Sequence, residues 1–557
     1  MRFKFKRRWL VVYFLITLIV TNIALLATEN IPPVAYCAYL FLPAGVSLLW
    51  LIALRREGIM YLLLLPMIFI HCAQMVLLSM WGGSIIASDM FRNIFTTNTG
   101  EATELLANLW PVVLFVAVLF LPAIWLAIKA VVHKETIERG IRIKALKCAI
   151  ALLAIGGISF YATRLCGHNF SIRNDIYPAN ALYNLKLAIK FSGQIDKHKE
   201  LSKDFRYNAS KSRHREGREI YIMVVGETSR AYNFGLYGYN RNTTPRLQKC
   251  NGLVTFRDAL TQSNATHKIV PLILTPAEAS NYDIIYGCKS ILTAFKEAGF
   301  KSIYISNHSY SHTLMDHFAT EADLFRSMRK ESGGRSYDID ALQIIEQECN
   351  NAPEQNLFIL LHIYGSHYKY SQRYRKDFSN YLPDKIETLS AKHKEAIINA
   401  YDNSILALDS LLVGVTRIIE EKSSTGAMLY LSDHGEDLMD DSRERMLHSS
   451  PIPTIYQARI PFLLWFSQGY REAFPQIYHN AELCSSNPIS SNAAFHTMLD
   501  IASISTPHLK RELSVVSDSF KVVPREYLTD HNLPVKVKDI DWDKRDLEVF
   551  ERDSIAF

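Results

Sequence analysis

The first third of the chain alternates long apolar segments with short polar ones. A helix of about 20 apolar residues can cross a bilayer core of about 30 Å. Five segments have this length, and they cover residues 9–27, 34–53, 60–80, 109–128 and 145–161. The first segment follows basic residues, as in a signal peptide, but it lacks a persuasive small-x-small cleavage site. The pattern therefore predicts an N-terminal transmembrane domain of five retained helices.

Basic residues are concentrated in alternate loops between these segments. They lie before the first segment, between the second and third, and between the fourth and fifth. The other two loops contain a single basic residue, Arg92. Because cytoplasmic loops carry the excess of lysine and arginine, the three basic loops define the cytoplasmic side. Five crossings then place the chain after about residue 165 on the opposite face.

The rest of the chain divides into a polar connector, 166–215, and a larger region, 216–557. Within the connector, residues 181–191 have apolar positions at near-helical spacing and lysines on the other face. This segment fits a helix on the membrane surface or a packed connecting helix equally well.

Short apolar runs alternate with helical stretches after residue 216. Buried strands that alternate with helices indicate an α/β domain with a mostly parallel sheet. The expected strands cover residues 219–225, 302–305, 356–363, 427–431 and 460–466.

Composition adds two limits. A formal net charge of +6 gives no reason to expect nucleic-acid binding. The eight cysteines include no CxxC pair, so a zinc-ribbon or thioredoxin motif is unsupported. Cys250, Cys288, Cys349 and Cys484 lie in the C-terminal region, where pairing is allowed outside the cytoplasm. The sequence does not determine their connectivity.

Residues able to bind a metal follow three of the predicted strands. Glu227 follows the first, His367 the third, and Asp433 and His434 the fourth. Each alone is more often a structural residue, but ligands bind beyond the carboxyl ends of strands in α/β sheets. Carboxylates with one imidazole suit Zn²⁺ or Mn²⁺, which can activate a coordinated hydroxyl. Candidates for that hydroxyl are Thr228, Ser229, Ser263 and Thr266.

Three motifs resemble those of the lipid A phosphoethanolamine transferases. They are VGETSRAYNFGLYGYNRNTTP at 225–245, LHIYGSH at 361–367 and LSDHGE at 431–436. This family includes the mobile colistin-resistance enzymes and belongs to the alkaline phosphatase/sulfatase superfamily. The resemblance implies five membrane helices followed by an external catalytic domain of sulfatase-like fold.

The resemblance also assigns the first set of site residues. Glu227, Asp433 and His434 align with the family's zinc ligands, with Mn²⁺ or Ca²⁺ as alternative metals. Thr266, five residues before Pro271, aligns with the threonine that is both nucleophile and metal ligand. Without this alignment, Thr266 would be read as an ordinary loop threonine.

Three histidines align with substrate-binding positions of the family. His367 and His448 match histidines that bind the phosphate or a second metal, and His312 stands where relatives carry a substrate-contacting lysine. A further departure concerns the cysteine pair that brackets the nucleophile in the best-known relatives. Gln262 and Leu272 occupy those positions here, so the nucleophile loop is expected to depend on other contacts.

The implied activity is transfer of phosphoethanolamine from phosphatidylethanolamine to a lipopolysaccharide, at lipid A or core, or to another envelope glycan. The covalent intermediate would form on Thr266, in the periplasm, with the helices in the inner membrane among its lipids. A phosphoglycerol transferase acting on an envelope glycan and a catalytically silent membrane scaffold are alternatives. A sulfatase lacks support, since no Cys- or Ser-x-Pro-x-Arg segment lies near Thr266.

Overall fold

The structure is a computed structural model that describes residues 7–29, 31–81, 85–96, 99–168, 170–213, 216–334, 336–386 and 390–557. The chain forms two compact units, Met1–Phe191 and Ser192–Phe557. The predicted domain boundaries near residues 165 and 215 stay predictions. The predicted helical segment 181–191 lies within α9 (Ala179–Asp196).

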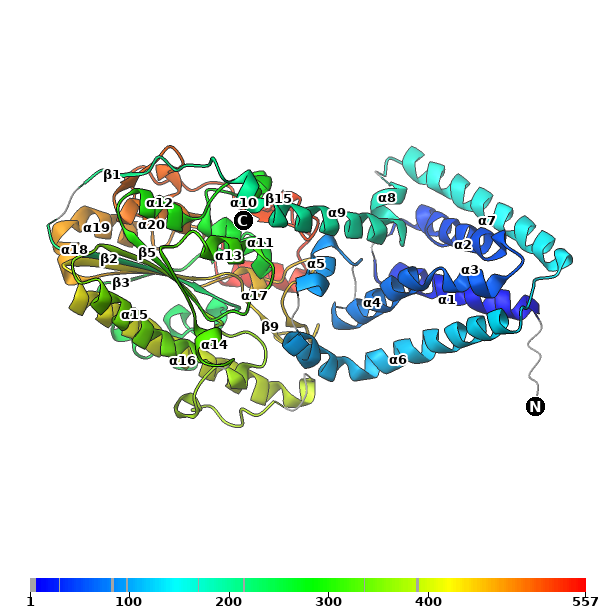
Figure 1. Ribbon diagram of the computed structural model, residues 1–557, viewed down its shortest axis with the longest axis horizontal. Coiled ribbons are helices and arrows are strands. Elements are labelled where there is room, and N and C mark those ends of the chain that lie inside the picture. The colour runs from blue at the N-terminus through cyan, green and yellow to red at the C-terminus, as the bar shows by residue number, and fades with distance from the viewer. Residues whose placement is uncertain are drawn as a thin grey trace. The chain divides into compact units, whose positions relative to one another are not determined.

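The first unit is built of apolar helices (Figure 1). Four described segments are long and apolar enough to cross a bilayer: α1 (Arg7–Thr28), Pro33–Ala53 with α2 (Tyr36–Ala53), Trp110–Val132 within α6 (Thr99–Val132), and α7 (Arg139–Leu165). The predicted segment 60–80 instead forms two shorter helices, α3 (Glu57–Leu62) and α4 (Leu65–Trp81). Pro66 explains the break, because proline has no N–H to bond to the carbonyl of Leu62, four residues earlier.

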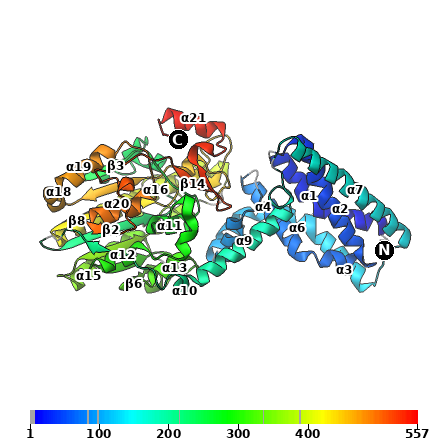
Figure 2. The same ribbon diagram turned by 90° about the horizontal axis from the view of Figure 1, so that it is seen from above.

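Glycines let α2 and α7 pack closely, side by side in Figure 2. A Cβ on Gly45 would meet Leu153 at 2.7 Å, and one on Gly156 would meet Leu42 at 2.9 Å. Small residues at such contacts let helix backbones approach within a membrane. This pair of helices therefore has the packing expected of membrane-spanning segments.

The second unit is built around a seven-stranded sheet of order β3-β11-β8-β2-β7-β5-β6. The strands are β2 (Glu219–Gly226), β3 (Leu253–Phe256), β5 (Lys301–Ser306), β6 (Leu324–Ser327), β7 (Leu357–His362), β8 (Thr425–Ser432) and β11 (Phe462–Phe466). β8, β2, β7, β5 and β6 are mutually parallel, and β11 is antiparallel to its two neighbours. The predicted α/β domain with a mostly parallel sheet is confirmed, together with all five predicted strands.

Helices cover both faces of this sheet (Figure 1). α15 (Ala341–Asn351) and α16 (Lys394–Lys422) lie on one face, and α12 (Ile291–Glu297) and α20 (Ala493–Ile501) on the other. Every residue of β2, β7 and β8 is buried, as expected for strands covered on both sides. Because β8, β2, β7 and β5 are neighbours and parallel, their carboxyl ends meet at one edge of the sheet.

Candidate metal and transfer site

Four predicted site residues come together at the carboxyl edge of the sheet. Register pairs Gly226 with Ser432, so Glu227 and Asp433 leave neighbouring strands side by side. The Thr266 hydroxyl lies 3.0 and 3.1 Å from the two carboxylate oxygens of Glu227, and 3.1 Å from Nε2 of His434. Nε2 of His434 is also 3.3 Å from Oδ2 of Asp433. Ligands about 2.0 Å from a tetrahedral zinc ion lie about 3.3 Å apart, so these atoms fit a bound cation.

Neighbouring groups orient two of these ligands. Oδ1 of Asp433 accepts hydrogen bonds from the backbone N–H groups of Thr228 and His434, whereas Oδ2 is buried and has no hydrogen-bond partner among the described residues. Nδ1 of His434 lies 2.9 Å from the Gly435 carbonyl, which can only accept. Nδ1 therefore carries the proton, and Nε2 presents its lone pair to the site.

Electrostatics favour a cation in this position. Burial, and then the neighbouring Asp433 carboxylate, raise the pKa of Glu227 well above its usual range. Burial also lowers the pKa of His434, which favours the neutral imidazole that binds metals. A divalent cation would offset the repulsion between the two carboxylates, and Oδ2 of Asp433, which has no hydrogen-bond partner among the described residues, could bind it. The donor set thus fits the metal that the sequence implied.

The backbone beside Glu227 is constrained. Thr228 has a φ of 55°, in the left-handed region that β-branched residues rarely adopt. Gly365 also has a positive φ, 53°, and a Cβ there would meet the Glu227 carbonyl oxygen at 2.4 Å. Only glycine allows this close approach. The position of Glu227 thus depends on two unusual backbone conformations, a frequent feature of functional sites.

Thr266 is the first residue of α11 (Thr266–Leu274). The positive end of a helix dipole favours negative charge there, whether on an alkoxide or on a phosphoryl group. Leu272, in one of the positions that relatives fill with cysteine, is fully buried in this helix. All eight cysteines, each within the described residues, are free thiols.

Hydrogen bonds support the loop before Thr266. Gln262 accepts a bond at its carbonyl from the Leu528 N–H, and its own N–H donates to the Ser491 hydroxyl. The N–H of Asn264 donates to the Tyr527 hydroxyl. Leu528 and Tyr527 belong to β14 (Glu526–Leu528), more than 250 residues further along the chain. Contacts with β14 and with Ser491 therefore support the loop before Thr266, where the family resemblance led us to expect a cysteine pair.

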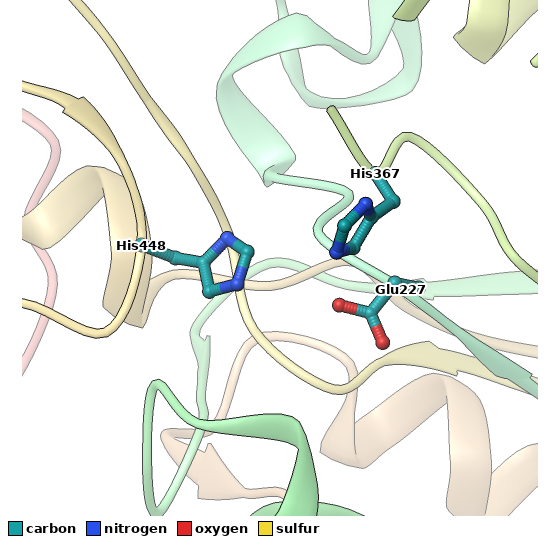
Figure 3. Close-up of side chains that lie close together, drawn as sticks. All are labelled: Glu227, His367 and His448. Atoms are coloured by element: carbon teal, nitrogen blue, oxygen red, sulfur yellow. The ribbon is translucent and has the colours of Figure 1, made fainter. Parts of the chain in front are cut away.

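His367 and His448 converge on Glu227 from two other loops (Figure 3). One ligand atom from each of the three residues lies within 4.8 Å of the others. Nδ1 of His367 lies 3.1 Å from the Tyr368 carbonyl and so donates to it, which leaves the Nε2 lone pair available. Burial, and then His448, lower the pKa of His367 well below its usual range.

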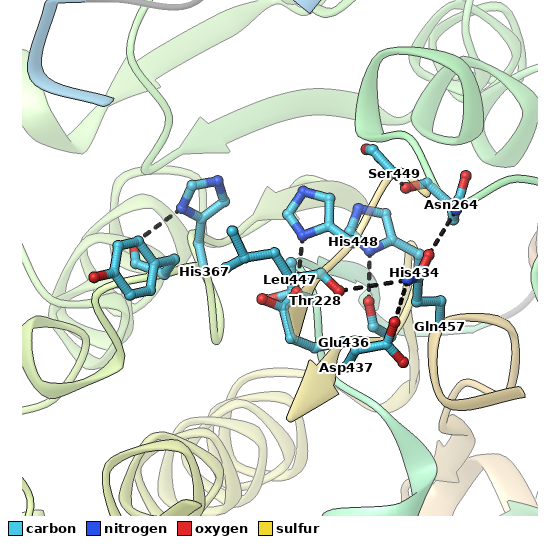
Figure 4. A network of polar contacts seen from close by, with 12 residues as sticks. Thr228, Asn264, His367, His434, Glu436, Asp437, Leu447, His448, Ser449 and Gln457 are labelled. Atoms are coloured by element: carbon cyan, nitrogen blue, oxygen red, sulfur yellow. Dashed lines mark hydrogen bonds and ion pairs between the residues drawn. The ribbon is translucent and has the colours of Figure 1, made fainter. Parts of the chain in front are cut away.

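Unlike His367, His448 is paired with a carboxylate, that of Glu436. Nδ1 of His448 lies 2.8 Å from a Glu436 carboxylate oxygen, and the Tyr370 hydroxyl donates to the other oxygen at 2.8 Å. Burial alone would lower the pKa of His448, but Glu436, helped by the Asp433 and Asp437 carboxylates, outweighs burial and raises the pKa. Figure 4 shows this pair beside a chain of contacts from Asn264 through Gln457 to Asp437. His448 therefore becomes cationic more readily than His367.

Sequence reasoning placed His312 in the site, but the structure does not bring it to these groups. The ring of His312 is exposed and packs edge-on against Tyr310, with 4.6 Å between ring centroids. Its role as a substrate contact stays a prediction. Three residues were missed: Glu436, and His308 and His362 beside Glu227. The sequence signal that could have found them was a titratable side chain at, or a few residues after, the end of a buried strand.

Comparisons with known proteins agree with this architecture. The sulfatase family model matches residues 219–504, and a second model, described as phosphoethanolamine transferase EptA/EptB, matches residues 40–190. The chain belongs to the sulfatase family. Residues 40–190 are similar to the EptA/EptB phosphoethanolamine transferases, in agreement with the family resemblance that the three motifs indicated.

Individual relatives cover different parts of the chain. Phosphoethanolamine transferase EptC of Escherichia coli K12 is 28% identical over 317 residues, 55% of this chain and 54% of EptC. The chain thus spans about half the length of this relative. A structure of the periplasmic domain of E. coli EptC in complex with Zn is 26% identical, with a TM-score of 0.55, over 61% of this chain and 98% of that one.

A further solved structure covers most of the chain. The integral membrane protein lipooligosaccharide phosphoethanolamine transferase A of Neisseria meningitidis has a TM-score of 0.70. It covers 91% of this chain and 97% of that chain at 20% identity. This match confirms the fold class, an apolar helical region followed by a sulfatase-type α/β domain.

Proposed function

We propose that this protein transfers phosphoethanolamine from phosphatidylethanolamine to a lipopolysaccharide, at lipid A or core, or to another envelope glycan. The observation that carries the proposal is the Thr266 hydroxyl, held within 3.1 Å of Glu227 and His434 at the start of α11. The names of the relatives support the transferred group, since both EptC and the N. meningitidis protein are phosphoethanolamine transferases.

Glu227, Thr266, Asp433 and His434 would hold the metal, and the zinc complex of the E. coli EptC domain supports zinc over Mn²⁺ or Ca²⁺. A bound zinc ion supplies Lewis acidity and lowers the pKa of a coordinated hydroxyl. The chain itself positions the oxygen, because Glu227 and His434 fix Oγ1 of Thr266 from two sides. The proton of that hydroxyl is released to solvent, because Glu227 and His434 would both be occupied as metal ligands.

The reaction consists of two displacements at phosphorus. In the first, Oγ1 of Thr266 bonds to the phosphorus of phosphatidylethanolamine, and the bond to diacylglycerol breaks. The diacylglycerol oxygen takes up a proton. In the second, a hydroxyl or phosphate oxygen of the acceptor attacks the same phosphorus, and an attacking hydroxyl gives up its proton. The Thr266 oxygen leaves and takes up a proton. His448, made more basic by Glu436, and His367 would contact the phosphoryl oxygens and stabilise their charge.

The location follows from the helices and the basic loops. The proposal places the apolar helices in the inner membrane, beside lipid donor and acceptor, and the second unit in the periplasm. The alternating basic loops support this orientation, as does the periplasmic domain of E. coli EptC.

The test combines glycolipid mass spectrometry with a donor assay. Cells expressing the wild type are expected to add phosphoethanolamine to their glycolipids, whereas Thr266→Ala cells are not, and separate lipid A and core fractions identify the acceptor. Thr320→Ala, which removes an exposed threonine at the end of α13 (Leu314–Ala319), serves as the matched control and keeps the addition.

Purified protein should release diacylglycerol from phosphatidylethanolamine but not from phosphatidylglycerol. The reverse donor preference would support the phosphoglycerol alternative. Addition that persists in Thr266→Ala would refute the role of the threonine.

A further inference from the structure

A second pair of histidines lies beside Glu227 and has no part in the proposed transfer. His362 is the last residue of β7, and His308 follows the end of β5 by two residues. β7 lies between β2 and β5, so both histidines are at the same sheet edge as Glu227. One ligand atom from each of the three residues lies within 4.8 Å of the others. The two imidazole rings stack with centroids 3.9 Å apart.

The hydrogen bond of His308 determines which nitrogen is free. Nε2 lies 2.8 Å from the Ile363 carbonyl oxygen, which can only accept, so Nε2 carries the proton. Nδ1 therefore presents a lone pair. Burial lowers the pKa of His308 to about 4, so the imidazole is neutral at pH 7. A neutral imidazole whose other N–H donates to a backbone carbonyl has the arrangement of a metal ligand.

His362 has a buried nitrogen without a partner. Its side chain is 2% exposed, Nδ1 lies 3.2 Å from the Tyr304 hydroxyl, and Nε2 has no hydrogen-bond partner among the described residues. Leaving a buried polar atom unsatisfied costs about 1–3 kcal/mol. If Nδ1 donates to Tyr304, Nε2 carries a lone pair, which a cation would satisfy. Burial lowers the pKa of His362 well below its usual range, so this ring is neutral as well.

We propose that Glu227, His308 and His362 bind a second divalent cation of the zinc class, separate from the one held by Asp433 and His434. Two imidazoles and one carboxylate are a common ligand set for zinc sites that keep a fourth position open. Glu227 would serve both cations, one through each carboxylate oxygen. The open position would accept an anionic oxygen, such as that of a phosphoryl group.

Two positive charges, those of Arg329 and Arg373, act against a cation at this site. After burial, which has the largest effect, both lower the pKa of His308, Arg329 more than Arg373. Both guanidinium groups are engaged with backbone carbonyls. Nε of Arg329 donates to the Asn307 carbonyl at 2.8 Å, and Nε of Arg373 donates to the His367 carbonyl at 2.9 Å. The Glu227 carboxylate supplies the negative charge within the site itself.

Zinc binding by the full chain in detergent tests the proposal. Protein stripped of metal is titrated with Zn²⁺ in competition with a chromophoric chelator. The His308→Gln and His362→Gln variants should each weaken the same zinc equivalent by at least about 100-fold, since even supporting residues of metal sites are worth 10- to 100-fold. Asp433→Asn should weaken a different equivalent, and the His308→Gln/Asp433→Asn double variant should lose both.

His479→Gln, which removes an exposed histidine on α19 (Pro475–Cys484), should bind as the wild type does. Unchanged binding in His308→Gln overturns the proposal, and so does a second equivalent that depends on His367 instead. If the variants do not fold, anomalous diffraction at the zinc edge on wild-type crystals decides. A peak between His308 and His362 supports the site, and a peak only at Asp433 and His434 overturns it.

These measurements do not use transfer activity, although the proposal shares Glu227 with the proposed transfer site. If His308→Gln or His362→Gln loses the second cation but still transfers phosphoethanolamine, the proposed function stands. Two bound cations without transfer would refute only the proposed function.

Discussion

Substitution of Gly365 by alanine tests how closely the metal ligand Glu227 depends on its backbone neighbours. The new Cβ would lie 2.4 Å from the Glu227 carbonyl oxygen and 2.8 Å from its nitrogen, where real contacts are at least 3.0 Å. The Glu227 backbone must therefore move by roughly 0.6 Å, more than the ~0.5 Å within which a site keeps its geometry. The positive φ of 53° adds about 1–2 kcal/mol of strain for any residue with a Cβ.

We expect Gly365→Ala to lower the free energy of unfolding by about 2–5 kcal/mol, the sum of the conformational strain and an overpacking cost of about 1–3 kcal/mol. Transfer should fall by one to two orders of magnitude, because a misplacement of about 1 Å can cost about 100-fold. Zinc affinity should fall with it. The assays are thermal unfolding of the full chain in detergent, competitive zinc titration, and diacylglycerol release.

Gly299→Ala is the matched control. Gly299 has a φ of 89°, but a Cβ there would meet nothing within 4 Å. Gly299→Ala therefore loses stability only through the conformational strain. The less flexible unfolded chain offsets this loss by about 0.4–1 kcal/mol. If Gly365→Ala and Gly299→Ala lose equal stability and both retain zinc affinity, the reasoning about close approach is wrong.

Three further predictions concern charge and metal. Glu436→Gln removes the carboxylate that raises the pKa of His448, so that pKa should fall. Since cationic His448 is lost as pH rises through this pKa, the alkaline limb of the pH–rate profile should move to lower pH; an unmoved limb would exclude His448⁺ as the titrating group. His496→Asn should make the free energy of unfolding fall less steeply as the pH drops. Burial lowers the pKa of His496 from 6.5 to about 3, so the unfolded chain binds more protons and stability falls between these values as pH drops, by about 1 kcal/mol per pH unit. Unfolding temperatures from pH 7 to 5 check this, and equal slopes in both proteins would contradict it. Finally, chelation should lower the unfolding temperature, because a ligand at 100 times its Kd stabilises by about 2.7 kcal/mol. The loss should be absent in Asp433→Asn/His308→Gln, and its persistence there would implicate other metal sites.

The sheet was predictable because its strands are buried on both faces and read as short apolar runs. Their order in the sheet was not, since β2, β7 and β5 are neighbours in space but far apart in sequence. Glu227 and Asp433 could be found because each directly follows such a run. His308 could be assigned to the same edge only once β5 was known to lie next to β7.

Other features required more than local pattern. Thr266 begins a helix rather than ending a strand, so only the family motif distinguished it from neighbouring hydroxyl residues. The third apolar segment is long enough to span a bilayer, but Pro66 divides it into α3 and α4, a local effect that segment length does not capture. Assignment of metal ligands, nucleophile and His312 remains a set of predictions for the experiments above.

The contacts between the nucleophile loop and β14 have a consequence for biosynthesis. Asn264 and Tyr527 are 263 residues apart, and the Leu528 N–H reaches Gln262 from the same strand. During synthesis the loop emerges long before these partners do. The nascent chain consequently carries the Thr266 loop without these two contacts until β14 has been synthesised. A chain released before β14 is synthesised would lack the Tyr527 and Leu528 contacts to this loop.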